Sequence, residues 1–94
     1  MRIRWLRTAE RNLEEIASYI AEDDPDAAAR VISRIAEAID LLPTHPAMGR
    51  AGRVVGTREL VIAGTPFIVP YRVRGKAVEI LRVMHGARRG PTSL

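Results

Sequence analysis

The sequence predicts an α+β domain, in which a pair of helices covers one face of a largely antiparallel sheet in the chain order β-α-α-β-β-β. Two stretches in the first half repeat their apolar residues at helical spacing. Three apolar segments in the second half are separated by short turn sequences. A chain of 94 residues can build one core but not two, so we expect a single domain over residues 1–94.

Residues 2–6, Arg-Ile-Arg-Trp-Leu, predict a short first strand with Ile3 and either Trp5 or Leu6 facing the core. Thr8 is the expected N-cap of the helix that follows. Apolar residues then recur every three or four positions over residues 9–22, which predicts an amphipathic helix. They are Ala9, Leu13, Ile16, Ala17 and Ile20.

The sequence Asp23-Asp24-Pro25-Asp26 predicts a break between two helices. Asp24 is suited to cap the second helix, and Pro25 suits a first helical position, where no backbone N–H is needed. Pro43 ends this helix, and the pair is expected to form an antiparallel hairpin over one face of the sheet. The apolar face of the second helix consists of Ala28, Val31, Ile32, Ile35, Ile39 and Leu42.

Residues 43–56 contain two prolines, three glycines and two arginines without an acidic residue, which predicts a basic loop. Strands are expected at residues 58–63 and 67–73, and a last strand begins at residue 77 and ends at Gly86. Pro70 has no N–H to donate, so its strand must have a bulge there or lose a hydrogen bond.

Alternation along a strand divides residues 67–74 between two faces. Phe67, Val69, Tyr71 and Val73 are expected under the helices, and Ile68, Pro70, Arg72 and Arg74 on the open face. In a continuous last strand His85 would share the side of Leu81 and Val83. We therefore expect a basic open face that continues into Arg82, Arg88 and Arg89.

Charge is divided unevenly along the chain. Residues 1–48 hold six arginines against nine acidic residues, a net −3, whereas residues 49–94 hold nine basic residues against two acidic ones, a net +7. There is no cysteine and there are only two distant histidines, so we expect no metal and no cofactor. No segment has the apolar length of a signal peptide or a membrane span, which predicts a cytoplasmic protein without membrane contact.

The order of elements resembles the RelE/ParE superfamily, the toxins of type II toxin-antitoxin modules. The resemblance covers nearly the whole chain and rests on Tyr71-Arg72-Val73, on Pro43-x-x-Pro46, on Gly49-Arg50, and on the segment from Val78 through His85 to Arg89. It implies a toxin held in a hetero-oligomer by a cognate antitoxin, ParD-like or similar.

Two activities occur in that superfamily: RelE-like members cleave messenger RNA on the ribosome, and ParE-like members inhibit DNA gyrase. RelE-like toxins resembling this chain carry an arginine at the position of Ile68 and tend to place a tyrosine in the C-terminal tail. This chain ends Gly-Pro-Thr-Ser-Leu, which we expect to be a flexible tail at about residues 90–94. These differences favour a ParE-like gyrase inhibitor that is not an enzyme.

The alternative is a metal-independent endoribonuclease, since His85 could act as a base and nearby arginines could contact phosphate. Its expected catalytic residues are His85, Arg82, Arg88 and Arg72. A simpler role for His85 is a half-buried residue at a strand end, and Arg82 could instead pair with Glu79 or Glu59. A plain nucleic-acid-binding domain and a non-toxic structural subunit are further alternatives, although aromatic residues for base stacking are scarce.

The expected binding residues form two sets. Target binding is assigned to Arg72, Arg74, Arg82, His85, Arg88 and Arg89. Antitoxin binding is assigned to the apolar helix faces and one strand residue: Leu13, Ile16, Ile20, Ile32, Ile35, Ile39 and Arg58.

Overall fold

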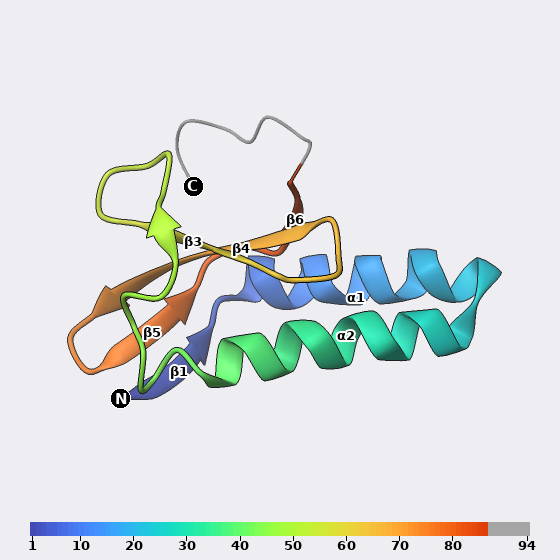
Figure 1. Ribbon diagram of the computed structural model, residues 1–94, viewed down its shortest axis with the longest axis horizontal. Helices are drawn as coiled ribbons and strands as arrows, with labels where there is room; N and C mark the ends of the chain where they lie inside the picture. Colours follow the sequence, from blue (N-terminus) through green and yellow to red (C-terminus); the bar gives the residue numbers. More distant parts are fainter. Residues whose placement is uncertain (87–94) are drawn as a thin grey trace.

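A computed structural model of the protein describes residues 1–86. Within them the helices α1 (Arg7–Asp23) and α2 (Pro25–Asp40) form a hairpin that packs on one face of a sheet and projects beyond its strands (Figure 1). The predicted two-layer α+β fold is confirmed. The strands are β1 (Arg2–Trp5), β2 (Arg50–Ala51), β3 (Arg58–Val61), β4 (Phe67–Arg74), β5 (Ala77–Ile80) and β6 (Met84–His85).

The sheet is mixed, with the strand order β1-β5-β4-β3-β2 and with β6 paired to β4. Only β1 and β5 run parallel among the described pairs, and the others are antiparallel. The two-residue strand β2 was not predicted, because so short a segment has no side-chain alternation to detect. Residues 84–85 of β6 were predicted as strand, but as the end of one continuous last strand. Within residues 1–86, neither helix is long and apolar enough to cross a membrane.

The core lies between the hairpin and one sheet face. β4 contributes Val69 and Tyr71, both fully buried, and Phe67 packs against them, as the alternation of that strand predicted. Val73, expected on the same face, is 45% exposed because it lies near the strand end. The helices, the other strands and the segments that follow them contribute Ala9, Ile35, Ile39, Leu42, Leu60, Ile62, Val78, Ile80 and Val83.

The start of α1 differs from the prediction. Leu6 is the N-cap residue and no side chain caps the helix, so the assignment of Thr8 as N-cap is wrong. The backbone N–H of Leu6 donates to the carbonyl of Ile80 at 3.0 Å, and the Leu6 carbonyl accepts from Glu10 at 3.1 Å. Pairing of the first strand with β5 therefore extends to the residue where the helix begins.

The start of α2 matches the prediction, since Asp24 Oδ1 accepts a hydrogen bond from the backbone N–H of Ala27 at 3.1 Å and Pro25 occupies the first turn. Replacing Asp24 by alanine is expected to lower the free energy of unfolding by about 1 kcal/mol. Asp40→Ala is the matched control, because an acidic residue at the C-terminal end of a helix opposes its dipole. Urea unfolding that ranked Asp40→Ala as the more damaging change would contradict the capping role.

The last strand is interrupted opposite Pro70. Tyr71 pairs with Ile80 and Ile68 pairs with Met84, so two residues of β4 oppose the three residues 81–83. This extra residue is a bulge. The Pro70 carbonyl accepts from the Leu81 N–H at 3.0 Å, and since the N and O of a strand residue point to the same neighbour, the missing N–H of Pro70 faces the bulge. The sequence predicted that the strand of Pro70 has a bulge or loses a hydrogen bond. β4 itself is continuous over Phe67–Arg74, and the extra residue lies in the segment opposite it, so the prediction of one continuous last strand to Gly86 is wrong.

The bulge also changes the side on which His85 lies. His85 pairs with Phe67, and the two rings meet edge to face with centroids 5.8 Å apart. Cross-strand partners share a face, so His85 lies on the face of Phe67 rather than on that of Leu81. The prediction that His85 shares the side of Leu81 is therefore wrong, because a single inserted residue reverses the alternation. Val83, a core residue, remains on the same side as His85.

Candidate functional site

Four arginines lie on the sheet face that points away from the helices. The register places Arg4 and Arg72 on either side of Glu79, and Arg2 and Arg74 on either side of Ala77. They face outward because the neighbouring strand residues, among them Ile3, Val78 and Ile80, pack into the core. We call Arg2, Arg4, Arg72 and Arg74, with Glu79 between them, the arginine array.

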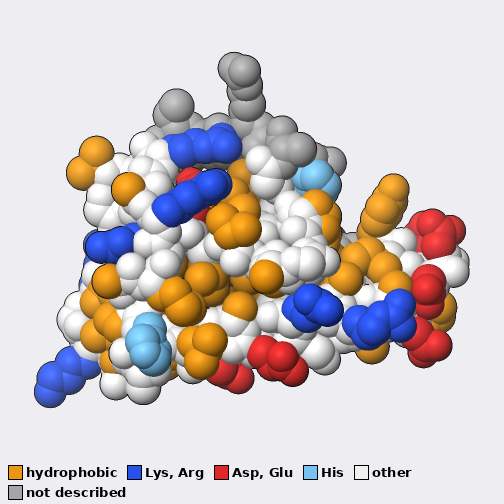
Figure 2. Space-filling model, viewed as in Figure 1, with side chains coloured by type: hydrophobic (Ala, Val, Ile, Leu, Met, Phe, Trp, Pro, Cys, Tyr) orange, Lys and Arg blue, Asp and Glu red, His pale blue; other side chains and the backbone are white. Residues whose placement is uncertain are grey.

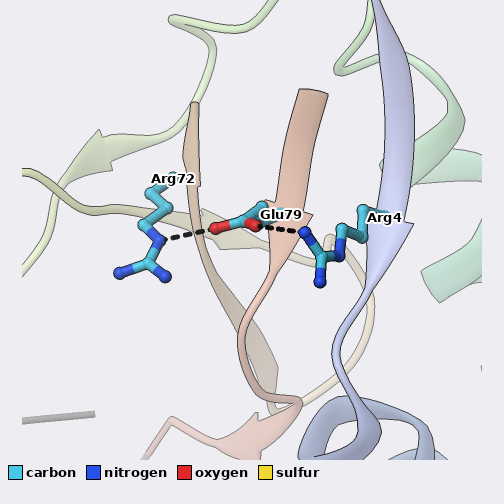
Figure 3. Close-up of polar contacts among 3 residues, drawn as sticks. All are labelled: Arg4, Arg72 and Glu79. Carbon is cyan, nitrogen blue, oxygen red and sulfur yellow. Dashed lines mark hydrogen bonds and ion pairs between the residues drawn. The ribbon is translucent and has the colours of Figure 1, made fainter. Parts of the chain in front are cut away.

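Glu79 holds two of these arginines in place. Its Oε1 accepts a hydrogen bond from Arg72 Nε at 2.7 Å, and its Oε2 accepts one from Arg4 Nη1 at 3.4 Å (Figure 3). The Glu79 side chain is only 4% exposed, while those of Arg72 and Arg4 are 35% and 63% exposed. The carboxylate is thus covered and the guanidinium groups reach solvent.

The Arg72 hydrogen bond is the main cause that lowers the pKa of Glu79 below its ordinary value of 4.5, and burial acts in the opposite direction. The positive charges of Arg72, Arg74 and Arg4 lower the pKa further. Glu79 is therefore ionised at neutral pH, and the array carries a net positive charge.

This lowered pKa predicts a specific pH dependence of stability. A carboxylate with a lower pKa in the folded state stabilises the fold above its unfolded pKa, and this contribution is lost as the pH falls through the folded pKa. The Glu79→Gln variant is therefore expected to have a lower free energy of unfolding than the natural protein at pH 7. The difference between the two free energies should shrink below about pH 4.5. Urea unfolding at several pH values measures this; a difference independent of pH would contradict the ionised role.

A second group of contacts anchors the loop after α2. The Tyr71 hydroxyl donates to the Pro46 carbonyl and accepts from the Gly49 N–H, both at 2.8 Å. Arg58 Nη1 donates to the carbonyls of Gly49 at 2.9 Å and Ala47 at 3.4 Å. The guanidinium of Arg58, expected at the antitoxin surface, is thus engaged by this loop.

The second buried carboxylate belongs to the same loop. Glu59 accepts from Arg50 Nη2 at 3.1 Å and from the Arg53 backbone N–H at 3.4 Å. Arg82 pairs with neither buried carboxylate and is half-buried, without a salt bridge to any residue in 1–86. The alternative of an Arg82 ion pair with Glu79 or Glu59 is therefore wrong, because nearer arginines occupy both.

The structure does not bring the expected target residues into one cluster. Arg72 and Arg74 lie on the outer face near one end of β4, whereas His85 pairs with Phe67 at the other end. His85 is exposed. Arg88, Arg89 and the expected tail at residues 90–94 lie outside the described residues.

The expected antitoxin residues divide by burial. Ile35 and Ile39 are 0% and 1% exposed, so this fold leaves them no surface for a partner. The other helix residues are half-buried: Leu13, Ile16, Ile20 and Ile32. In the view of Figure 2, most acidic side chains lie along the helix hairpin and several basic ones lie over the strands, as the division of charge in the sequence predicted.

Sequence reasoning missed Arg2 and Arg4 as members of the basic face. The available signal was the alternation Arg-Ile-Arg-Trp, which places both arginines opposite the core residues of the first strand. Pairing of that strand with β5, far away in the sequence, is what brings them to Glu79.

A small helix hairpin packed on one face of a mixed sheet agrees with the fold of the RelE/ParE toxins. Residues 3–90 match the family described as ParE toxin of type II toxin-antitoxin system, parDE. The chain belongs to this ParE toxin family and is a toxin of a type II toxin-antitoxin system, a class in which each toxin has a cognate antitoxin.

Known relatives and a solved structure agree with this assignment. The chain is 55% identical to Y4kP of Sinorhizobium fredii over 99% of its own length and 96% of the relative's. It is 36% identical to Toxin RelE2 of Caulobacter vibrioides, over 89% and 93% of the two chains. A chain of the chromosomal ParDE TA system from P. aeruginosa superposes with a TM-score of 0.83 at 32% identity, covering 90% of this chain and 95% of that one.

Proposed function

We propose that this toxin is ParE-like in activity: it inhibits DNA gyrase, is not itself a nuclease, and is neutralised by a ParD-like antitoxin. Relatives that carry ParE and RelE names are both similar to the chain. The choice between the two activities therefore depends on this chain's own residues.

The observation that carries the proposal is the separation of His85 from Arg72. RNA cleavage without a metal requires a base, an acid and cations around one phosphate, each within hydrogen-bond reach. Arg72 is five residues along β4 from Phe67, the partner of His85. At about 3.3 Å per residue this is roughly 16 Å, and residues an odd number apart lie on opposite faces. These two side chains cannot act on the same phosphate.

Two further features support the proposal. Ile68 occupies the position at which RelE-like toxins resembling this chain carry an arginine, and its apolar side chain is buried, with 4% exposure. Arg72 Nε is engaged by Glu79, which restrains the guanidinium over the outer face. The RelE-like mRNA interferase is kept as the second candidate because His85 is exposed at a strand end with Arg82 three residues before it.

Two assays on the purified toxin test the proposal: supercoiling of plasmid DNA by gyrase, and integrity of messenger RNA on translating ribosomes. We expect inhibited supercoiling with accumulation of cleaved DNA, and intact message. Message cleavage with normal supercoiling would overturn the proposal in favour of the nuclease.

His85→Gln sharpens the distinction between the two activities. If His85 were a general base, this change would slow message cleavage about 100- to 10,000-fold. We expect instead that no cleavage is present to lose, and that gyrase inhibition persists with at most an about 10-fold weaker potency, because a contact residue affects affinity and not chemistry. His45→Gln, at the exposed loop histidine, is the control for loss of an imidazole.

A further inference from the structure

The arginine array keeps donors available after Glu79 is satisfied. Glu79 takes the Nε of Arg72 and one Nη of Arg4, so the remaining N–H groups of both guanidinium groups point away from it (Figure 3). Arg2 and Arg74 are exposed and form no salt bridge with residues 1–86. Because the carboxylate orients two guanidinium groups in advance, an anion that binds them meets a smaller loss of side-chain entropy.

The spacing of the array is that of a flat sheet. Arginines on β1 and β4 are two strands apart, about 10 Å, and successive arginines on one strand are about 7 Å apart. Four arginines against one carboxylate leave a net charge of +3 on this area. Such a surface suits a ligand that carries several anionic groups in a row.

The surroundings of the array distinguish between polyanions. A disordered acidic peptide needs apolar contacts to offset the conformational entropy that it loses on binding. The apolar residues beside the array, Ala77 and Leu81, are buried and offer no such contact. Single-stranded nucleic acid is held largely by stacking on aromatic rings, and the aromatic residues of these strands, Trp5, Phe67 and Tyr71, pack in or against the core. A duplex needs only charge and hydrogen bonds to its backbone.

We propose that the arginine array binds the phosphodiester backbone of duplex DNA without sequence preference. This goes beyond the proposed function, in which gyrase is contacted as a protein: it gives Arg72 and Arg74, expected above to bind the target, a role with Arg2 and Arg4 in holding the toxin on the DNA where the enzyme acts. DNA binding is measured on the toxin alone, without gyrase. A result that shows no DNA binding would therefore leave the proposal of gyrase inhibition standing.

The test is fluorescence anisotropy of a labelled, random-sequence 24-bp duplex titrated with the toxin at several salt concentrations. Four phosphate contacts predict a slope of about −3.6 in a plot of log affinity against log salt, or an about 150-fold loss between 50 mM and 200 mM salt. The double variant Arg2→Gln/Arg74→Gln should halve the slope and bind about 50-fold more weakly at 100 mM salt. Neither side chain has a salt bridge within residues 1–86, so the fold is expected to persist.

The control is Arg11→Gln/Arg30→Gln, which removes the same charge from exposed positions of the two helices. It should change the DNA affinity less than about 3-fold. Equal losses of DNA affinity in the two double variants would overturn the proposal, since the total charge of the protein would then explain the binding. Stronger binding of the labelled single strand or of poly-glutamate than of the duplex would also overturn it, in favour of that other ligand.

Discussion

Tyr71→Ala is expected to lower the free energy of unfolding by about 3–5 kcal/mol, a large fraction of the roughly 5–15 kcal/mol available to a domain of this size. Tyr71 is fully buried in the core, and its hydroxyl joins the sheet to the loop at Pro46 and Gly49. The change therefore leaves a cavity and releases two hydrogen bonds. Urea unfolding followed by far-UV circular dichroism measures the loss.

Tyr71→Phe separates the two contributions, because it keeps the ring and removes the hydroxyl. It leaves the Gly49 N–H, which is buried, without its partner, at an expected cost of about 1–3 kcal/mol. Tyr19→Ala is the matched control: Tyr19 is 75% exposed and its loss should cost within about 0.5 kcal/mol. A Tyr71→Phe variant as stable as the natural protein would show that the hydroxyl does not anchor the loop.

Arg82→Gln is expected to weaken the gyrase inhibition that we propose about 30-fold or more, the size of effect found when a central contact residue of an interface is lost. Arg82 is half-buried and has no salt bridge within residues 1–86. A charged side chain without an internal partner adds little to folding, so the free energy of unfolding should change by no more than about 0.5 kcal/mol. Supercoiling assays and urea unfolding on the same preparation measure both quantities.

Arg30→Gln is the control for charge, since Arg30 lies in the helix hairpin and its only salt bridge within residues 1–86, to Asp24 at 4.0 Å, joins two exposed side chains. Antitoxin affinity should stay within about 10-fold in the Arg82→Gln variant. Parallel loss of stability and gyrase inhibition in that variant would instead make Arg82 a structural residue.

Local patterns predicted those parts of the fold that depend on neighbours in the sequence. The Asp24-Pro25 start of α2 and the core face of Phe67, Val69 and Tyr71 are as the sequence indicated, because capping and alternation are properties of a few adjacent residues. Pro70 predicted an irregular pairing for the same reason, although the extra residue lies in the opposite segment, residues 81–83, and not in the strand of Pro70. The short strands β2 and β6 carry no such pattern, and a leucine at the start of α1 gave no capping signal.

The sequence by itself determined that this protein is a two-layer α+β domain with a basic second half and a toxin-like order of elements. Only the tertiary structure decided which charges meet. Parallel pairing of β1 with β5 brings Arg4 to Glu79 across 75 positions of the chain, and the single inserted residue opposite Pro70 moves His85 away from the outer arginines. Both depend on strand register, which is set by packing against the whole core rather than by any local run of residues.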